Sequence, residues 1–135
     1  MAIRVYLAGP MSGLVDHNFP AFTNATARLR QSGFSVISPA EMSGLPENSH
    51  LTWQDHMHRD IRLVLECDTI ALLPGWEKSK GARLEVFVAA CLGKGFIEAE
   101  TGLSIQSEKI LVKWLTEVTF WVTDFALEAI KASDK

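Results

Sequence analysis

The feature that most constrains the fold is an alternation of short apolar segments with longer amphipathic ones. Apolar runs lie at residues 3–8, 34–38, 69–73 and 96–99, and the first three end at a Gly or Pro. Helical periodicity separates them, at residues 19–33, at 52–66 with Thr52 as the N-cap, and at 81–92. Strands that alternate with helices form a parallel sheet covered on both faces. We therefore predict an α/β fold, a Rossmann-like three-layer sandwich with a mainly parallel sheet of four or five strands.

The rest of the chain gives weaker signals. Residues 39–52 are rich in Pro, Gly, Asn and Ser, which predicts a long irregular connection. Residues 110–115, after Ile105, predict a fifth strand, and a last helix begins at Thr116 with an apolar stripe that packs either in the core or between subunits. We predict a single domain over residues 1–135, with residues 101–135 as a C-terminal extension.

Charge and composition exclude several classes of protein. The chain has 13 Lys plus Arg against 16 Asp plus Glu and no strong basic cluster, so binding to a nucleic-acid polymer is not expected. No apolar run approaches the roughly 20 residues of a spanning helix, and the N-terminus does not resemble a signal peptide, which predicts a cytoplasmic protein without membrane contact. Cys67 and Cys91 lie in apolar stretches, and His56 and His58 would point about 200° apart on a helix, so no metal site is expected.

A ligand site is expected beyond the carboxyl ends of the first and third predicted strands, because open α/β sheets bind ligands there. Gly9, Ser12 and Gly13 follow the first strand, and Ser79 and Gly81 precede the helix after the third. Small residues and a helix N-terminus let backbone N–H groups approach an anion, although glycines at strand ends also serve to turn the chain.

Glu85 is the most informative single residue. Between residues 84 and 93 it is the only charged residue of an apolar helix. An unpaired carboxylate facing the sheet would cost several kcal/mol, so it must be paired, neutralised or open to a cleft. The alternative is a surface residue or a salt bridge to Lys80 or Arg83.

Three further side chains could act with Glu85. Asp60 lies on the inward stripe of the preceding helix, and Asp68 stands at the entry to the third strand, either in the site or as a turn residue. Tyr6, near the end of the first strand, either reaches a carboxylate with its hydroxyl or packs as an aromatic ring.

These residues together resemble a known family. The sequence YLAGPMSG at residues 6–13, the acids Asp60 and Asp68, and S-x-G-x-x-x-E at residues 79–85 resemble the nucleoside 2-deoxyribosyltransferase superfamily, in particular its DUF4406 branch. The resemblance covers about residues 3–100. It implies that Glu85 is the nucleophile at the anomeric carbon of the sugar, and that Asp60 and Tyr6 assist and orient.

The position of Ser79 bears on the substrate. Six residues before the nucleophile, base-exchanging transferases tend to have an acid, whereas deoxynucleoside 5'-monophosphate N-hydrolases resemble this chain in having a serine. An acid would repel a 5'-phosphate, and a serine at a helix N-terminus can bind one. We expect Ser79, Ser12 and the backbone around Gly9 and Gly81 to form the anion pocket, with Lys78 or Lys80 either adding charge or lying in solvent.

The resulting expectation is a hydrolase or transferase that cleaves the base–sugar bond of a nucleotide or nucleoside and needs no cofactor. The rival is a nucleotide-binding or partner-binding protein without activity. An enzyme requires Glu85, Asp60 and Tyr6 to converge on one cleft, and the rival predicts a Glu85 held outside any pocket. Relatives commonly complete the site across a dimer, so a homo-oligomer is expected through the apolar tail with Trp114, Trp121 and Phe125.

Overall fold

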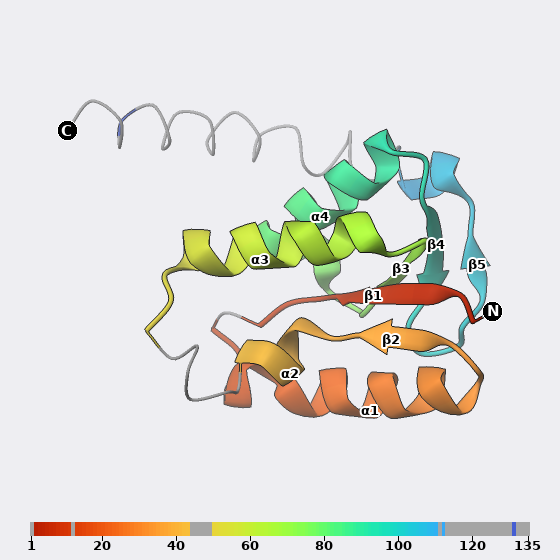
Figure 1. Ribbon diagram of the computed structural model, residues 1–135, viewed down its shortest axis with the longest axis horizontal. Coiled ribbons are helices and arrows are strands. Elements are labelled where there is room, and N and C mark those ends of the chain that lie inside the picture. Colours follow the sequence, from red (N-terminus) through yellow and green to blue (C-terminus); the bar gives the residue numbers. More distant parts are fainter. Residues whose placement is uncertain (1, 12, 44–49, 111, 113–130, 132–135) are drawn as a thin grey trace.

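A five-stranded sheet forms the middle layer of the fold, between α1 and α2 on one face and α3 and α4 on the other (Figure 1). The computed structural model describes residues 2–11, 13–43, 50–110, 112 and 131. Both the α/β class and the three layers predicted from the sequence are confirmed. The predicted helix from residue 116, with Trp121 and Phe125, lies outside the described residues.

Four strands are parallel and the fifth is antiparallel, in the order β2-β1-β3-β4-β5. The strands are β1 Arg4–Ala8, β2 Ser35–Ile37, β3 Thr69–Leu72, β4 Gly95–Glu98 and β5 Ser104–Ile105. Because β1 is central, its residues from Val5 to Ala8 are buried on both faces of the sheet. The side chains of Val5 and Leu7 pack toward α1, and those of Tyr6 and Ala8 toward α3 and α4.

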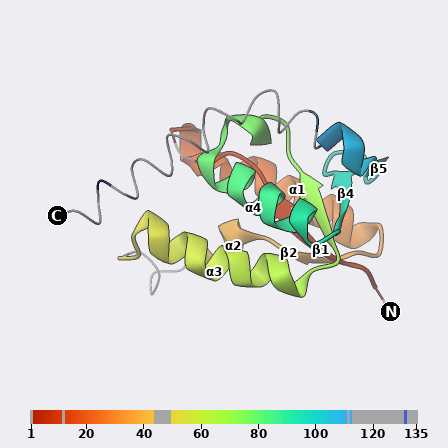
Figure 2. The same ribbon diagram turned by 90° about the horizontal axis from the view of Figure 1, so that it is seen from above.

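The helices follow the strands as the periodicity predicted. They are α1 Phe19–Gln31, α2 Pro39–Ser43, α3 Trp53–Glu66 and α4 Lys80–Cys91, with short 3-10 turns η1 Val15–Asn18 and η3 Trp76–Lys78 before α1 and α4. The helices α3 and α4 pack against each other on one face of the sheet (Figure 2). Within the described ranges, no helix is both long enough and apolar enough to cross a membrane.

Two predictions about the irregular parts of the chain are wrong. Residues 39–52 do not form a wholly irregular connection, because they begin with the short helix α2. The fifth strand is Ser104–Ile105, since a turn stabilised by Gly102 N–H donating to the Glu98 carbonyl (2.8 Å) brings the chain straight back beside β4. Of the strand predicted at residues 110–115, residues 111 and 113–115 lie outside the described residues. Ile110 instead belongs to a helical segment and is buried in the core. Periodicity alone cannot tell whether a short apolar run such as this one forms a strand or a buried helix.

A complete capping box starts α3, as the Thr52 N-cap predicted. The Thr52 Oγ1 accepts a hydrogen bond from the Asp55 backbone N–H (3.1 Å), and the Thr52 backbone N–H donates to Asp55 Oδ2 (3.0 Å). The pKa of Asp55 is lowered by hydrogen bonding of its carboxylate to Thr52, first to the backbone N–H and then to the hydroxyl. The box sets where the first turn of α3 begins, beside the cavity described below.

We expect Thr52→Ala to lower the free energy of unfolding by about 1 kcal/mol, because the Asp55 N–H loses its acceptor. Thr52→Ser keeps the hydroxyl and should stay close to the wild type. Urea unfolding of the three proteins measures the difference. Equal losses in the two variants would show that the hydroxyl does not cap the helix.

Candidate active site

A cavity of about 670 Å³ opens beyond the carboxyl end of β1, between the N-terminal ends of α3 and α4. The strand order reverses at β1, since β2 lies on one side of it and β3 on the other. Open α/β sheets usually bind ligands at such a point. The volume of the cavity is within the range of small-molecule pockets, about 300–1,000 Å³. Its wall is made by five segments of the chain, with the lining residues Gly9, Pro10, Met11, His17, Phe19, Pro39, Ser43, Trp53, His56, Met57, Asp60, Lys78, Ser79, Lys80, Gly81, Ala82 and Glu85.

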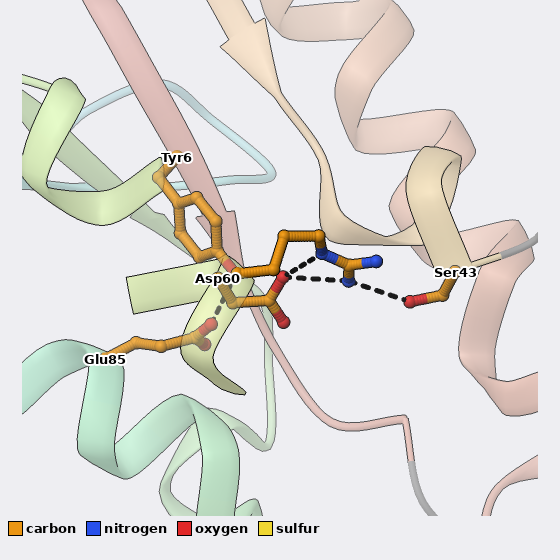
Figure 3. A network of polar contacts seen from close by, with 5 residues as sticks. Tyr6, Ser43, Asp60 and Glu85 are labelled. Atoms are coloured by element: carbon orange, nitrogen blue, oxygen red, sulfur yellow. Dashed lines mark hydrogen bonds and ion pairs between the residues drawn. The ribbon is translucent and has the colours of Figure 1, made fainter. Parts of the chain in front are cut away.

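Glu85 lies in the floor of this cavity and is only 5% exposed. Tyr6 of β1 is fully buried, and its hydroxyl donates a hydrogen bond to Glu85 Oε2 of α4 (Figure 3). Glu85 is therefore not a surface residue, and the hydroxyl of Tyr6 does reach a carboxylate. The alternation of side chains along β1 explains the contact, because it turns Tyr6 to the side of the sheet that α4 covers.

Asp60 is the second buried acid of the cavity, at 7% exposed. The neighbouring Arg59 places both Nε (2.9 Å) and Nη2 (2.8 Å) on the same oxygen, Asp60 Oδ1. The Arg59 Nη2 also donates to Ser43 Oγ at the end of α2 (3.2 Å), so one guanidinium joins α3 to α2 (Figure 3).

Burial raises the pKa of both acids, and the rise is larger for Glu85 than for Asp60, which is in contact with Arg59. Burial raises the pKa of Glu85 well above its ordinary value, and the nearby Asp60 raises it further, against the lowering effects of the Tyr6 hydrogen bond and Arg59. Burial also raises the pKa of Asp60, against the lowering effect of Arg59. Burial, followed by the charge of Glu85, raises the pKa of Tyr6 well above its ordinary value, so its hydroxyl stays a donor at neutral pH.

The opposite wall of the cavity is built around the start of α4. The Ser79 Oγ caps this helix by accepting from the Ala82 N–H (3.2 Å), and the hydroxyl hydrogen remains available as a donor. Lys80 Nζ lies 4.5 Å from the centre of the Trp53 ring of α3. A Cβ on Gly81 would come within 3.1 Å of the Met57 sulfur, so a larger residue there would press on the α3 wall.

Comparison with protein families gives one match, over residues 3–98, to the domain of unknown function DUF4406. The chain belongs to the DUF4406 family. A comparison of the chain with curated proteins finds no match.

Solved structures with the same fold include two 2-deoxyribosyltransferases. One, from Bacillus psychrosaccharolyticus, has a TM-score of 0.56 at 22% identity and matches over 69% of each chain. The other, from Leishmania mexicana, has a TM-score of 0.54 at 22% identity and covers 77% of this chain and 78% of its own. A conserved protein from Enterococcus faecalis V583 has a TM-score of 0.58 at 20% identity over 73% of this chain, which spans 63% of the length of that protein. The likeness to the superfamily predicted from the sequence is confirmed at the level of the fold.

The structure brings most of the sequence-predicted site residues of this DUF4406 protein together. Gly9, Asp60, Ser79, Gly81 and Glu85 line one cavity. Tyr6 lies beneath it, bonded to Glu85. The requirement for glycine at position 9 has a packing cause, because a Cβ there would lie 2.7 Å from that of Leu73.

Three predicted binding residues are not placed in the cavity. Asp68 precedes β3 at the amino end of the sheet, where its Oδ2 accepts from the Arg4 N–H (3.2 Å), so the structure gives it a strand-pairing role away from the site. Gly13 is an exposed turn residue with a φ of 78°, outside the lining of the cavity. Ser12 lies outside the described residues.

Sequence reasoning missed Arg59 and Ser43. Arg59 lies beside the apolar stripe of α3, and Ser43 falls in the connection that was predicted to be irregular, so no periodic signal singled out either one. Only the charge of Arg59 next to a buried acid hinted at the pairing. Among the residues that the structure describes, no cluster of three or more His, Cys, Asp or Glu side chains could hold a metal ion.

The raised pKa of Glu85 predicts how stability depends on pH. As the pH rises above about 4, the unfolded chain releases the Glu85 proton before the folded protein does, so this group contributes progressively less to the free energy of unfolding until the pH passes its folded pKa. Glu85→Gln keeps an oxygen for the Tyr6 hydroxyl and has no proton to lose. We expect its stability to rise relative to the wild type by up to about 1.4 kcal/mol per pH unit over this window.

Urea unfolding between pH 4 and pH 8 measures this difference. Glu66→Gln is the control, because it removes an exposed carboxylate at the end of α3. Parallel stability curves for wild type and Glu85→Gln would contradict a carboxyl that favours its neutral form in the fold.

Proposed function

We propose that this DUF4406 protein cleaves the N-glycosidic bond of a nucleoside 5'-monophosphate, with Glu85 as the nucleophile. The observation that carries the proposal is the convergence of Glu85 and Asp60 in one buried cavity, with the Tyr6 hydroxyl on Glu85. Two sequestered acids at the ligand-binding edge of an α/β sheet are costly to the fold, and such groups are typical of catalytic sites. A nucleotide-binding protein without activity would not need them.

A carboxylate suits this reaction because N-glycoside cleavage passes through an oxocarbenium-like state. In the first step Glu85 gives up its proton as one of its oxygens bonds to the anomeric carbon and the bond to the base breaks. The base leaves with the bonding electron pair and takes up that proton through Asp60 or water. In the second step water or another base attacks the same carbon and releases the Glu85 carboxylate. The Tyr6 hydroxyl holds the carboxylate in place and stabilises its charge when it leaves the sugar.

Asp60 has a separate role in this mechanism. Its Oδ1 is occupied by Arg59, and Oδ2 has no hydrogen-bond partner among the described residues. Oδ2 can therefore accept a hydrogen bond from a sugar hydroxyl or exchange a proton with the leaving base or the attacking water. Both roles require Asp60 to lie beside, not on, the line of attack from Glu85.

Two observations on the fold support the class of bond. The 2-deoxyribosyltransferases from Bacillus psychrosaccharolyticus and Leishmania mexicana share this fold, and the motif at residues 79–85 resembles the one in which their superfamily carries its nucleophile. The preference for water over a second base as acceptor rests on Ser79, because superfamily members that resemble this chain in having a serine there are N-hydrolases of nucleoside 5'-monophosphates. A homo-oligomer and a cytoplasmic location, both expected from the sequence, stay predictions of the same proposal.

The start of α4 is the proposed phosphate site. The N–H groups of a first helical turn have no intrahelical partner, and the Ser79 hydroxyl can donate while it caps the helix. Lys78 and Lys80 line the same wall and bring positive charge to it. This arrangement favours a 5'-monophosphate over the uncharged nucleoside.

The reaction is tested by measuring release of free base from a panel of ribo- and deoxyribonucleoside 5'-monophosphates. Glu85→Gln and Glu85→Ala should lower turnover by at least about a thousand-fold, because the carbon loses its nucleophile. Glu66→Gln, outside the cavity, is the matched control. Normal hydrolysis by Glu85→Gln would remove Glu85 from this role, and a wild type that binds monophosphates without releasing any base would favour the binding protein instead.

The phosphate site is tested at Ser79. Asp is a good N-cap, so Ser79→Asp should keep the start of α4 and add only a negative charge. We expect the Kd for a monophosphate to rise at least tenfold, or about 1.4 kcal/mol, and that for the nucleoside to stay unchanged. Calorimetry with Ser79→Thr as the control measures both. Equal wild-type affinity for nucleoside and monophosphate, or no response to Ser79→Asp, would contradict a phosphate site here.

A further inference from the structure

The Arg59 guanidinium connects two walls of the cavity. Its Nε and Nη2 lie 2.9 Å and 2.8 Å from Asp60 Oδ1, and Nη2 donates to Ser43 Oγ at 3.2 Å (Figure 3). The Arg59 side chain is 20% exposed. Two donors on one oxygen leave the other oxygen of Asp60 without a partner in the described part of the chain.

The hydrogen bonds of Arg59 do not by themselves explain why much of its guanidinium is buried. Its Nη1 is buried and lacks a hydrogen-bond partner among the described residues. A guanidinium taken out of water with a donor unsatisfied is unfavourable unless a charge nearby compensates for it. The compensating charge is the Asp60 carboxylate, so the ion pair determines the position of Arg59.

Asp60 and Glu85 also create an electrostatic problem. Two acids in one buried site repel each other when both are ionised, and such a pair tends to keep one proton. The titratable and charged groups that face them come from every element around the site: Tyr6 of β1, His17 of η1, His56 and Arg59 of α3, Lys78 of η3 and Lys80 of α4. Among these, Arg59 makes direct contact with Asp60 and Tyr6 with Glu85.

We infer that Arg59 is a positioning residue, which keeps Asp60 ionised and holds its Oδ1 so that Oδ2 is the oxygen offered to the ligand. The role of Asp60 in the reaction rests on the proposed function, whereas the ion pair does not. Through Ser43, the same guanidinium sets the end of α2 relative to Asp60, so two walls of the cavity are aligned by one side chain. Burial raises the pKa of Asp60 and Arg59 opposes this rise, which agrees with the inference.

The unliganded protein tests the inference without any substrate. The titration of the Asp60 carboxyl carbon is followed by NMR, with its signal identified by its loss in Asp60→Asn. Arg59→Gln should raise the half-titration pH of Asp60 by about one to three units, because it removes the opposite charge. Arg59→Lys should keep it within about half a unit of the wild type, since the charge remains. Arg62→Gln, an exposed arginine of the same helix, is the matched control and should leave it unchanged.

The pH profile of kcat/KM gives a second readout. In Arg59→Gln its acidic limb should move upward, because Arg59 opposes the rise in pKa of both Asp60 and Glu85. In Arg59→Lys the limb should stay in place while kcat falls by about tenfold or more, because an ammonium group cannot hold Asp60 and Ser43 with the geometry of a guanidinium.

The outcomes separate this inference from the proposed function. A wild type without base release would contradict the proposed function and leave the titration test intact. An Asp60 titration that does not change in Arg59→Gln would overturn the inference. If Arg59→Gln does not fold, Arg59→Lys decides alone, because a rise of more than one unit with the positive charge still present would overturn it as well.

Discussion

The buried contact between the Glu85 carboxylate and the Tyr6 hydroxyl is the interaction on which the arrangement of the site depends. It requires a central strand that turns Tyr6 toward α4 and a helix whose apolar face carries one acid to the same point. A carboxyl group at this depth needs a hydrogen-bond partner, and the buried phenol, which stays protonated, is such a partner. The close packing of α4 on the sheet, through Ala82, Val86 and Ala89, brings the two groups together.

The second acid makes the site asymmetric. Asp60 is held by a cation and Glu85 by a neutral hydroxyl, so the two carboxyl groups have different partners although both are buried. Different environments for two acids are how one site assigns them different chemical tasks. Here the asymmetry agrees with a nucleophile in the floor of the cavity and an orienting acid in its wall.

The likeness to the 2-deoxyribosyltransferases lies in the fold. Parallel strands end together, and the helices that follow them start at the same edge, so side chains from distant segments meet there. The middle of α3 supplies Asp60, and the first turns of α4 with their N-cap supply Glu85 and Ser79 in this way. The DUF4406 member thus has the fold of these enzymes, with Ser79 as the cap of α4 and Arg59 paired with Asp60 at this edge of the sheet.

The sequence by itself determined the element order, the parallel sheet and most of the cavity. The signals for these features are local: the periodicity of apolar residues, the Gly and Pro residues that end the strands, and the Thr52 N-cap that begins a helix. Glu85 was recognisable as the one charge in an apolar helix, and Asp60 as an acid on an apolar stripe. Only the tertiary structure decided that Asp68 lies at the wrong end of β3, that Ile110 is helical, and that α2 begins at Pro39. Only the tertiary structure, likewise, joined Arg59 to Ser43, since the contact depends on how α2 and α3 meet across a connection whose sequence has no period.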